Sequence, residues 1–198
     1  MIDAGAHSPI RLVAGFTLSR IQMKPNTVGS IGDWTGEYVI GSAVGEVFKE
    51  AGLSGLSLEP VTNPKTGLPH EGYFQIYSKD ILAAATIDCS VERVRSRFQE
   101  EDGHLRHLGC LSYPAVALVS RPDFSRTAEP WNGWHGWPSW VVTARVVSAF
   151  KQSKCRGWHF RPVLTTESDL YSQYISQWQQ LCSAVAQTRK SQFDGGRW

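Results

Sequence analysis

The sequence lacks the patterns that most often mark an enzyme or a membrane protein. It has no Gly-x-Ser-x-Gly, no P-loop and no Gly-x-Gly-x-x-Gly, the signatures of serine hydrolases, P-loop nucleotidases and dinucleotide enzymes. No apolar run approaches the ~18 residues that a membrane-spanning helix needs. The first sixteen residues have no basic segment followed by an apolar run, so no signal peptide is predicted. We therefore expect a soluble, cytoplasmic protein that is not an enzyme and has no membrane partner.

Cysteine and charge are also scarce. The four cysteines form no CxxC pair, which argues against a disulfide framework and favours reduced thiols. Charged residues make up 19% of the chain and the net charge is +2, too little to indicate a nucleic-acid partner. Residues 151–198 hold seven Lys and Arg against three Asp and Glu, a local balance of +4. That region is either a solvated basic face or a docking surface for an acidic partner.

What the sequence does contain is a duplication. Val39 to Val61 and Val141 to Val163 align without a gap at an offset of 102 residues (141 − 39). Each copy predicts a short strand, a helix, a turn with glycine, a second strand and a Pro-Val stop. Ser42 and Thr143 are placed to cap the two helices, and Gly52 is placed to end the first. The identical pairs are Val39/Val141, Val44/Val146, Phe48/Phe150, Lys49/Lys151, Gly55/Gly157, Pro60/Pro162 and Val61/Val163.

The rest of the chain completes a single domain of residues 1–198. We predict a strand at 73–77, a short helix at 90–98 and a loop at 99–109. A buried strand at 114–121 and a long connection at 122–140 follow. A long amphipathic helix is predicted for residues 167–189, with a loose tail at 190–198. The helix carries an apolar stripe of Leu170, Tyr174, Trp178, Leu181 and Val185. The fold class is α/β or α+β, with a mixed sheet.

The most distinctive segment is Trp131-Asn-Gly-Trp134-His135-Gly-Trp137-Pro-Ser-Trp140, in which Trp recurs at every third residue. A backbone with three residues per turn would place all four Trp on one face. They can form a lid over the core, or an exposed recognition loop, since Trp is enriched at interface hot spots. We take Trp131, Trp134, His135, Trp137 and Trp140 as candidate partner-binding residues.

One set of residues has the ligand types of a zinc site. Cys89 and the pattern His104-x-x-His107-x-x-Cys110 supply two thiols and two imidazoles. Nothing in the sequence brings Cys89 to the other three, and the spacing is not that of a standard zinc knuckle. We therefore predict no metal and no cofactor, with zinc left open as the alternative.

The second repeat copy resembles a segment of the immunity proteins of bacterial polymorphic toxin systems. Two groups are similar, the double-CxxCG immunity proteins and the broader families of small α/β immunity proteins. This chain has no CxxCG, and only His107-Leu-Gly-Cys110 is similar to the second such motif. The residues that carry the resemblance are Val141, Val142, Thr143, Val146, Phe150, Gly157, Phe160, Pro162 and Val163.

The resemblance implies a protein that binds a cognate protein toxin in the cytoplasm and neutralises it by occluding its active site. Such a protein works by contact, without catalysis or a cofactor. Two alternatives stay open at the level of the sequence. One is an enzyme of another family that reverses a toxin-made modification, and the other is a zinc-stabilised adaptor module.

Overall fold

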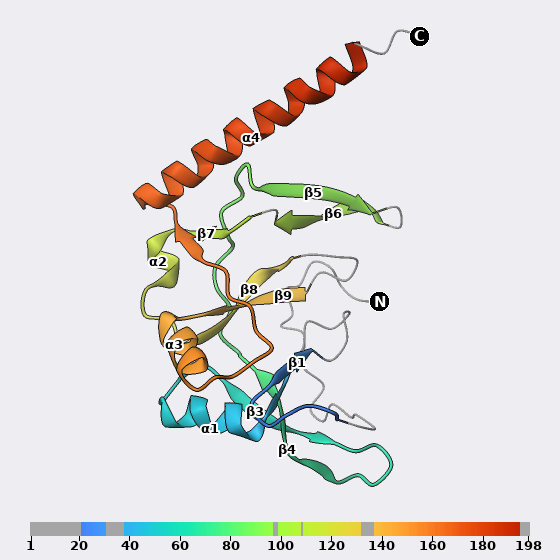
Figure 1. Ribbon diagram of the computed structural model, residues 1–198, viewed down its shortest axis with the longest axis vertical. Helices are drawn as coiled ribbons and strands as arrows, with labels where there is room; N and C mark the ends of the chain where they lie inside the picture. Colours follow the sequence, from blue (N-terminus) through green and yellow to red (C-terminus); the bar gives the residue numbers. More distant parts are fainter. Residues whose placement is uncertain (1–20, 31–37, 97–98, 108, 132–136, 195–198) are drawn as a thin grey trace.

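The computed structural model shows an α+β fold with mixed sheets and a projecting C-terminal helix (Figure 1). It describes residues 21–30, 38–96, 99–107, 109–131 and 137–194. Within these ranges only the backbone is described at residues 30, 92–96, 99–107, 129–131, 137–138 and 188–194. The predicted fold class is confirmed, including the long helix at the C-terminal end.

The first sheet is antiparallel, with the strand order β1-β2-β4-β3. The predicted strand at 73–77 lies within β4, where aromatic and β-branched residues favour extended backbone. Strands β2 and β3 both run antiparallel to β4, so they are parallel to each other with β4 between them. The bounds are β1 (Val28–Ser30), β2 (Tyr38–Gly41), β3 (Ser57–Thr62) and β4 (Pro69–Tyr77).

Helix α1 (Ser42–Glu50) joins β2 to β3 and follows the prediction for the first repeat copy. Val44 and Phe48 are buried on its inner face. The helix ends as predicted at Gly52, which has a φ of 59° and donates its N–H to the Lys49 carbonyl at 3.0 Å. At the other end the prediction was wrong, because the N-cap is Gly41 and no side chain caps the helix.

The second copy repeats the helix but not the returning strand. Helix α3 (Ala144–Gln152) is nine residues long, the same length as α1. It buries Val146 and Phe150 at the positions equivalent to Val44 and Phe48. Residues 158–162 form no strand, in contrast to the prediction. Trp158 and Phe160 pack against the core instead, and the chain resumes strand structure only at β10 (Val163–Thr165). Core packing therefore replaces sheet pairing in this copy.

Trp158 is the centre of an aromatic core that joins the two copies. Phe48 stacks on it at 6.0 Å between ring centroids, and Phe150, the equivalent residue of the second copy, stacks on it at 5.5 Å. Phe124 and Phe160 contact the same indole at 6.4 and 6.1 Å. The two repeat helices thus share one ring as their common packing surface, which explains why both copies keep a phenylalanine there.

Two further sheets complete the fold. One has the order β5-β6-β8-β9, with β6 and β8 parallel and the other pairs antiparallel. The other is a parallel pair of β7 and β10. Strands β5 and β6 stand where a helix at 90–98 and a loop at 99–109 were expected. Strand β8 and the first part of β9 lie within the connection expected at 122–140, and β9 continues into the strand predicted at the start of the second copy. The bounds are β5 (Val91–Ser96), β6 (Gln99–His107), β7 (Leu111–Tyr113), β8 (Phe124–Trp131) and β9 (Trp137–Val142).

The predicted strand at 114–121 is instead a short helix, α2 (Ala115–Leu118). Pro114 precedes it with a φ of −57°, and the Ala117 N–H donates to the Pro114 carbonyl at 2.9 Å. Ser120, with a φ of 58°, follows the helix. The apolar run that suggested a buried strand is only partly buried, since Ala117 lies in the core while Val116 is 80% and Val119 64% exposed.

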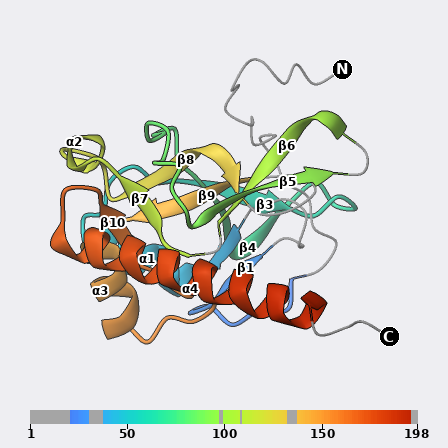
Figure 2. The same ribbon diagram turned by 90° about the horizontal axis from the view of Figure 1, so that it is seen from above.

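Helix α4 (Asp169–Asp194) is the longest element and projects beyond the rest of the fold (Figures 1 and 2). It begins after Ser168, whose hydroxyl accepts the Tyr171 N–H at 3.2 Å and so satisfies one of the free N–H groups of the first turn. It includes residues 190–194, which we had expected to be a loose tail. Among the described helices, none has the length and apolar character to cross a bilayer.

Candidate functional site

The tryptophan segment lies on the β8–β9 hairpin. Trp131 ends β8, Trp137 begins β9, and the two are paired across the ladder. Trp134 and His135 lie outside the described residues. The backbone at the start of β9 is a strand, with a two-residue side-chain period rather than the expected three. The role of these residues in recognition stays a prediction.

Trp140 is the member of the segment whose side chain is described, and it packs inward. Its ring meets Phe124 edge to face, with 6.3 Å between centroids. The Arg126 guanidinium lies over the Trp140 ring at 4.7 Å, a cation–π contact. Trp140 therefore takes the packing role that the sequence left open, as part of the cover of the aromatic core.

The candidate zinc ligands lie in three different surroundings. His104 and His107 are in β6, whose side chains lie outside the description. The backbone N–H of Cys110 donates to the Tyr174 hydroxyl at 2.8 Å, and the exposed Cys89 lies against α4. Among the described residues no three His, Cys, Asp or Glu side chains are grouped to hold a metal ion.

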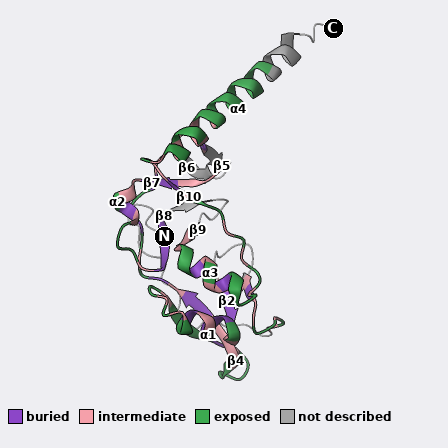
Figure 3. Ribbon diagram, turned by 60° about the vertical axis from the view of Figure 1, so that its left-hand side comes forward, coloured by how far each residue is buried: buried purple, intermediate pink, exposed green. Residues whose placement is uncertain are grey.

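The apolar stripe of α4 is partly covered only at Tyr174 and Trp178, and Leu170 before them is 59% exposed. Tyr174 and Trp178 pack against the segment at Gly109 and Cys110. Beyond them Leu181 is 54% exposed and Val185 is 46% exposed. Figure 3 shows that most of the described surface of this helix is exposed. We call Trp178, Leu181 and Val185 the α4 stripe.

The α4 stripe also lies in an uncharged part of the chain. Residues 170–188 contain no Asp, Glu, Lys or Arg, and their polar residues are almost all Gln and Ser. An exposed helix of a soluble protein usually carries charges on its solvent face. Large exposed apolar side chains without nearby charge are typical of surfaces that another molecule covers.

Asp88 fixes the start of α4 to the body of the protein. Its carboxylate accepts the Ser90 hydroxyl at 2.6 Å, the Ser112 hydroxyl at 2.9 Å and the Tyr171 hydroxyl at 3.2 Å. Partial burial raises the pKa of Asp88, but these hydrogen bonds and one from the Ser90 backbone outweigh it and leave the pKa below its usual value. One carboxylate thus links the turn before β5, strand β7 and helix α4.

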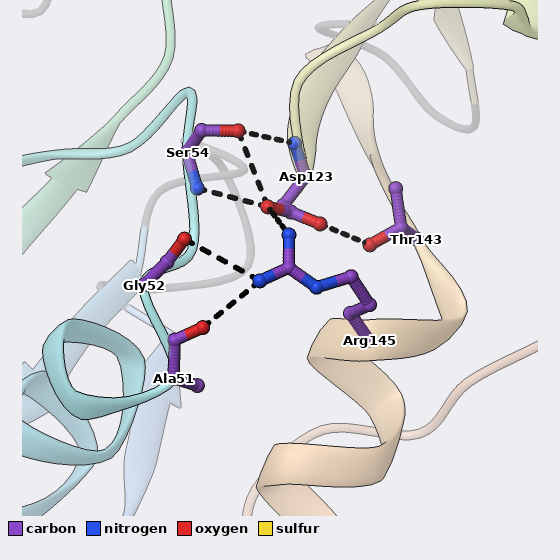
Figure 4. A network of polar contacts seen from close by, with 6 residues as sticks. All are labelled: Ala51, Gly52, Ser54, Asp123, Thr143 and Arg145. Carbon is purple, nitrogen blue, oxygen red and sulfur yellow. Dashed lines mark hydrogen bonds and ion pairs between the residues drawn. The ribbon is translucent and has the colours of Figure 1, made fainter.

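A second carboxylate joins the two repeat copies (Figure 4). Asp123 accepts the Thr143 hydroxyl at 2.6 Å, the Arg145 guanidinium at 2.9 Å and the Ser54 backbone N–H at 3.0 Å. Arg145 also donates to the Ala51 carbonyl at the end of α1, at 3.0 Å. The donors of this network come from both copies, so it connects the end of α1 to the start of α3.

The electrostatics of Asp123 suit a structural role. Burial raises the pKa of its carboxyl group. The hydrogen bonds from Thr143 and Ser54 and the charge of Arg145 lower this pKa by more than burial raises it, so it lies below its usual value. The side chain is only 4% exposed. Because its oxygens are already bonded to donors within the fold, this carboxylate holds the two copies together and is poorly placed to act on a bound molecule.

Comparisons with known proteins assign no family to this chain. A scan of the chain against protein-family models found no match, and a search of curated proteins found no similar sequence.

Two features of the site were missed from the sequence. No local sequence pattern indicates the role of Asp123, because its hydrogen-bond donors lie 69 residues before it and about 20 residues after it along the chain. A sequence pattern does indicate the α4 stripe, since its apolar spacing and the absence of nearby charges are both visible in the sequence. Spacing alone predicts an apolar face and does not say whether the fold covers it.

Proposed function

We propose that this chain is an immunity protein that binds a cognate bacterial toxin and occludes its active site. Support for this class comes from the resemblance carried by the second repeat copy, in particular Val146, Phe150 and Gly157. The contact surface that we assign is the α4 stripe, with the β8–β9 hairpin as a second candidate. The protein acts through binding in the cytoplasm, without catalysis or a cofactor.

The observation that carries a binding function is the geometry of the α4 stripe. Trp178, Leu181 and Val185 stand at positions i, i+3 and i+7 of a projecting helix. These are the anchor positions of helices that dock in the apolar groove of a partner. Leu181 and Val185 are exposed, and Trp178 beside them is half-buried, so a partner groove would contact two aliphatic anchors and the uncovered part of one indole. A projecting helix can also enter a concave active site, which a flat surface cannot do.

The length of α4 limits the kind of interface that it can form with a partner. A stable interface buries on the order of 1,600 Å² in total, about 800 Å² on each partner. The part of α4 after Trp178 has sixteen residues, which is about 24 Å of helix. Insertion into a cleft covers such a rod on several sides, so its buried area is larger than in a side-by-side contact. We therefore expect a concave partner surface.

The test is co-expression with the toxin encoded by the adjacent gene. We expect this protein to prevent killing and to co-purify with the toxin. Leu181→Glu is expected to weaken both effects by at least tenfold, because it places a charge in the centre of the stripe. Gln180→Glu is the matched control, since it adds the same charge to the neighbouring exposed residue, which lies about 100° around the helix from Leu181.

The outcomes separate the function from the surface. If the wild-type protein neither protects the cell nor co-purifies with the toxin, the proposed function is wrong. If Leu181→Glu and Gln180→Glu both protect as well as the wild type, the protein binds through a surface other than the α4 stripe. Circular dichroism of both variants checks that the helix is retained, as expected because glutamate is a good helix former.

A further inference from the structure

We propose that Cys89 and Cys182 form a redox clasp, an intramolecular disulfide that ties α4 to the turn before β5 under oxidising conditions. This inference goes beyond the proposed function and does not depend on what the α4 stripe binds. Both thiols are free and exposed in the structure, so a small oxidant can reach them. They are 93 residues apart in sequence (182 − 89), and only the fold brings them to the same part of the molecule.

The first observation is the contact between Cys89 and the helix. The Cys89 Sγ lies 4.0 Å from the Ile175 carbonyl oxygen of α4. The neighbouring Asp88 bonds to Tyr171 and Ser112, so the turn that carries Cys89 is held against α4. The thiol is therefore presented to the helix by a fixed anchor one residue away.

The second observation is the helical register of Cys182. It follows Ile175 by seven residues, which corresponds to two turns within ~20° and about 10.5 Å of rise. The two residues therefore lie on the same side of α4. The Ile175 carbonyl points toward the C-terminal end of the helix, and side chains lean toward the N-terminal end. The Cys182 side chain thus leans toward the place where the Cys89 thiol lies.

The electrostatics agree with this proximity. The pKa of Cys89 is raised by burial, by the negative charge of Asp88 and by the charge of Cys182. A thiolate at Cys182 thus disfavours a second thiolate at Cys89. The raised pKa also means that Cys89 reacts more readily as the pH rises.

The reaction needs an oxidant, for which we name a small-molecule disulfide such as oxidised glutathione. One protein thiolate attacks a glutathione sulfur, forms a mixed disulfide and expels the first glutathione thiolate. The other protein thiolate attacks the protein sulfur of that mixed disulfide, forms the Cys89–Cys182 bond and expels the second. The two protein thiols lose two protons and two electrons. The electrons reduce oxidised glutathione, and the two released thiolates take up two protons.

The bond would fix the direction of α4. Along this helix the contacts with the body are made by residues up to Trp178, and Cys182 is one turn further on. Cys182 is also the neighbour of Leu181, so a bond there holds the α4 stripe in place. Disulfide geometry requires the two Cα atoms to be about 4.4–6.8 Å apart when the bond forms.

The test uses the full chain and oxidised glutathione in excess at pH 8.5, followed until the adduct pattern stops changing. We expect the intact mass to fall by two hydrogens, and non-reducing digestion to give one linked peptide that joins Cys89 to Cys182. The Cys89→Ser and Cys182→Ser variants should lose this link, and Cys155→Ser should keep it. Closing a loop of about ninety residues should raise the Tm by roughly 5–15 °C, and dithiothreitol should reverse the rise.

Three results would overturn the clasp. They are glutathione adducts on Cys89 and Cys182 without a link, a link that joins two separate chains, and a link from either residue to Cys110 or Cys155. Each would show that the two thiols do not meet within one molecule. None of them bears on toxin binding, which the co-expression test decides on its own.

Discussion

At the scale of single residues, the glycines of the two copies serve two different purposes. Gly52 has a φ of 59° and open space around it, so it serves only to end α1. Gly157 has a φ of 104°, and a Cβ there would collide with the Val28 carbonyl. Gly55, its equivalent in the first copy, has a φ of 83° and faces the Phe124 carbonyl in the same way. The duplicated glycine is therefore one that the packing of the backbone requires.

Alanine substitution should separate these two purposes. Gly52→Ala is expected to lower the free energy of unfolding by about 1 kcal/mol, the cost of a left-handed conformation for a residue with a Cβ. Gly157→Ala adds a steric clash with backbone and should cost roughly 2–5 kcal/mol. Urea unfolding of both variants measures the difference. Equal losses would show that the contact with Val28 is not restrictive.

Lys154 is the position in the second copy that corresponds to Gly52. It has a φ of 55°, and its N–H donates to the Lys151 carbonyl at 3.1 Å, as Gly52 does to Lys49. Lys154→Gly should raise the free energy of unfolding by roughly 1 kcal/mol, because it removes the strain of a left-handed conformation at a non-glycine residue. The bond from Asn26 to the Lys154 carbonyl uses backbone and is kept. Thermal unfolding that shows no gain would contradict this.

At the scale of elements, α1 and α3 are two copies of one packing unit. Each has nine residues, a buried valine and a buried phenylalanine, and the two phenylalanines stack on the same Trp158 ring. The two ends of this unit are also joined through Asp123 and Arg145. Helix α4 is different, because the contacts with the body that its described side chains make at Tyr171, Tyr174 and Trp178 lie in its first turns.

Truncation of the equivalent phenylalanines should give similar losses. Phe48→Ala and Phe150→Ala are each expected to lower the free energy of unfolding by ~3–5 kcal/mol, as for other buried aromatic truncations. Chemical denaturation of both variants measures this. Leu170→Ala on α4 is the control, expected to change stability by less than about 1 kcal/mol because Leu170 is exposed. A large loss from one phenylalanine alone would mean that the copies do not share the core equally.

At the scale of the whole molecule, two carboxylates, the buried Asp123 and the half-buried Asp88, tie distant segments together. Asp123 joins the two repeat copies, and Asp88 joins β7 and the turn before β5 to α4. Hydrogen bonds hold the pKa of both groups below its usual value in the folded protein. In the unfolded chain these groups return to a pKa near 3.9, so the unfolded state binds more protons at acid pH.

The sign of the pH effect follows from this difference. The stabilisation by Asp123 is complete above the unfolded pKa and is lost as the pH falls through the lower folded pKa. Urea unfolding should therefore show a free energy that decreases from about pH 5 toward pH 3 and below. Asp123→Asn should be less stable than the wild type at pH 6 and should show a weaker decrease with acid. An unchanged slope in this variant would show that other groups cause the acid sensitivity.

The sequence by itself determined the elements whose cause is local. The α1 and α3 helices, the stop at Gly52, the strand within β4 and the amphipathic α4 each follow from spacing, propensity and turn residues a few positions apart. The same local patterns were misleading at β5, β6 and α2. A polar run such as residues 99–107 becomes a strand because backbone hydrogen bonds to β5 do not depend on side-chain polarity. Those partners are fixed by the fold and are absent from the local pattern.

Only the tertiary structure decided which patterned faces are covered. Trp140 lies against the core, while Leu181 and Val185 of α4 stand in solvent, and neither fact can be deduced from apolar spacing. The resemblance depends on residues such as Val146 and Phe150, which the fold buries as scaffold. The Asp123 network and the approach of Cys89 to α4 join segments far apart in sequence. The physical reason is the same in each case, because burial and contact depend on residues that only folding brings together.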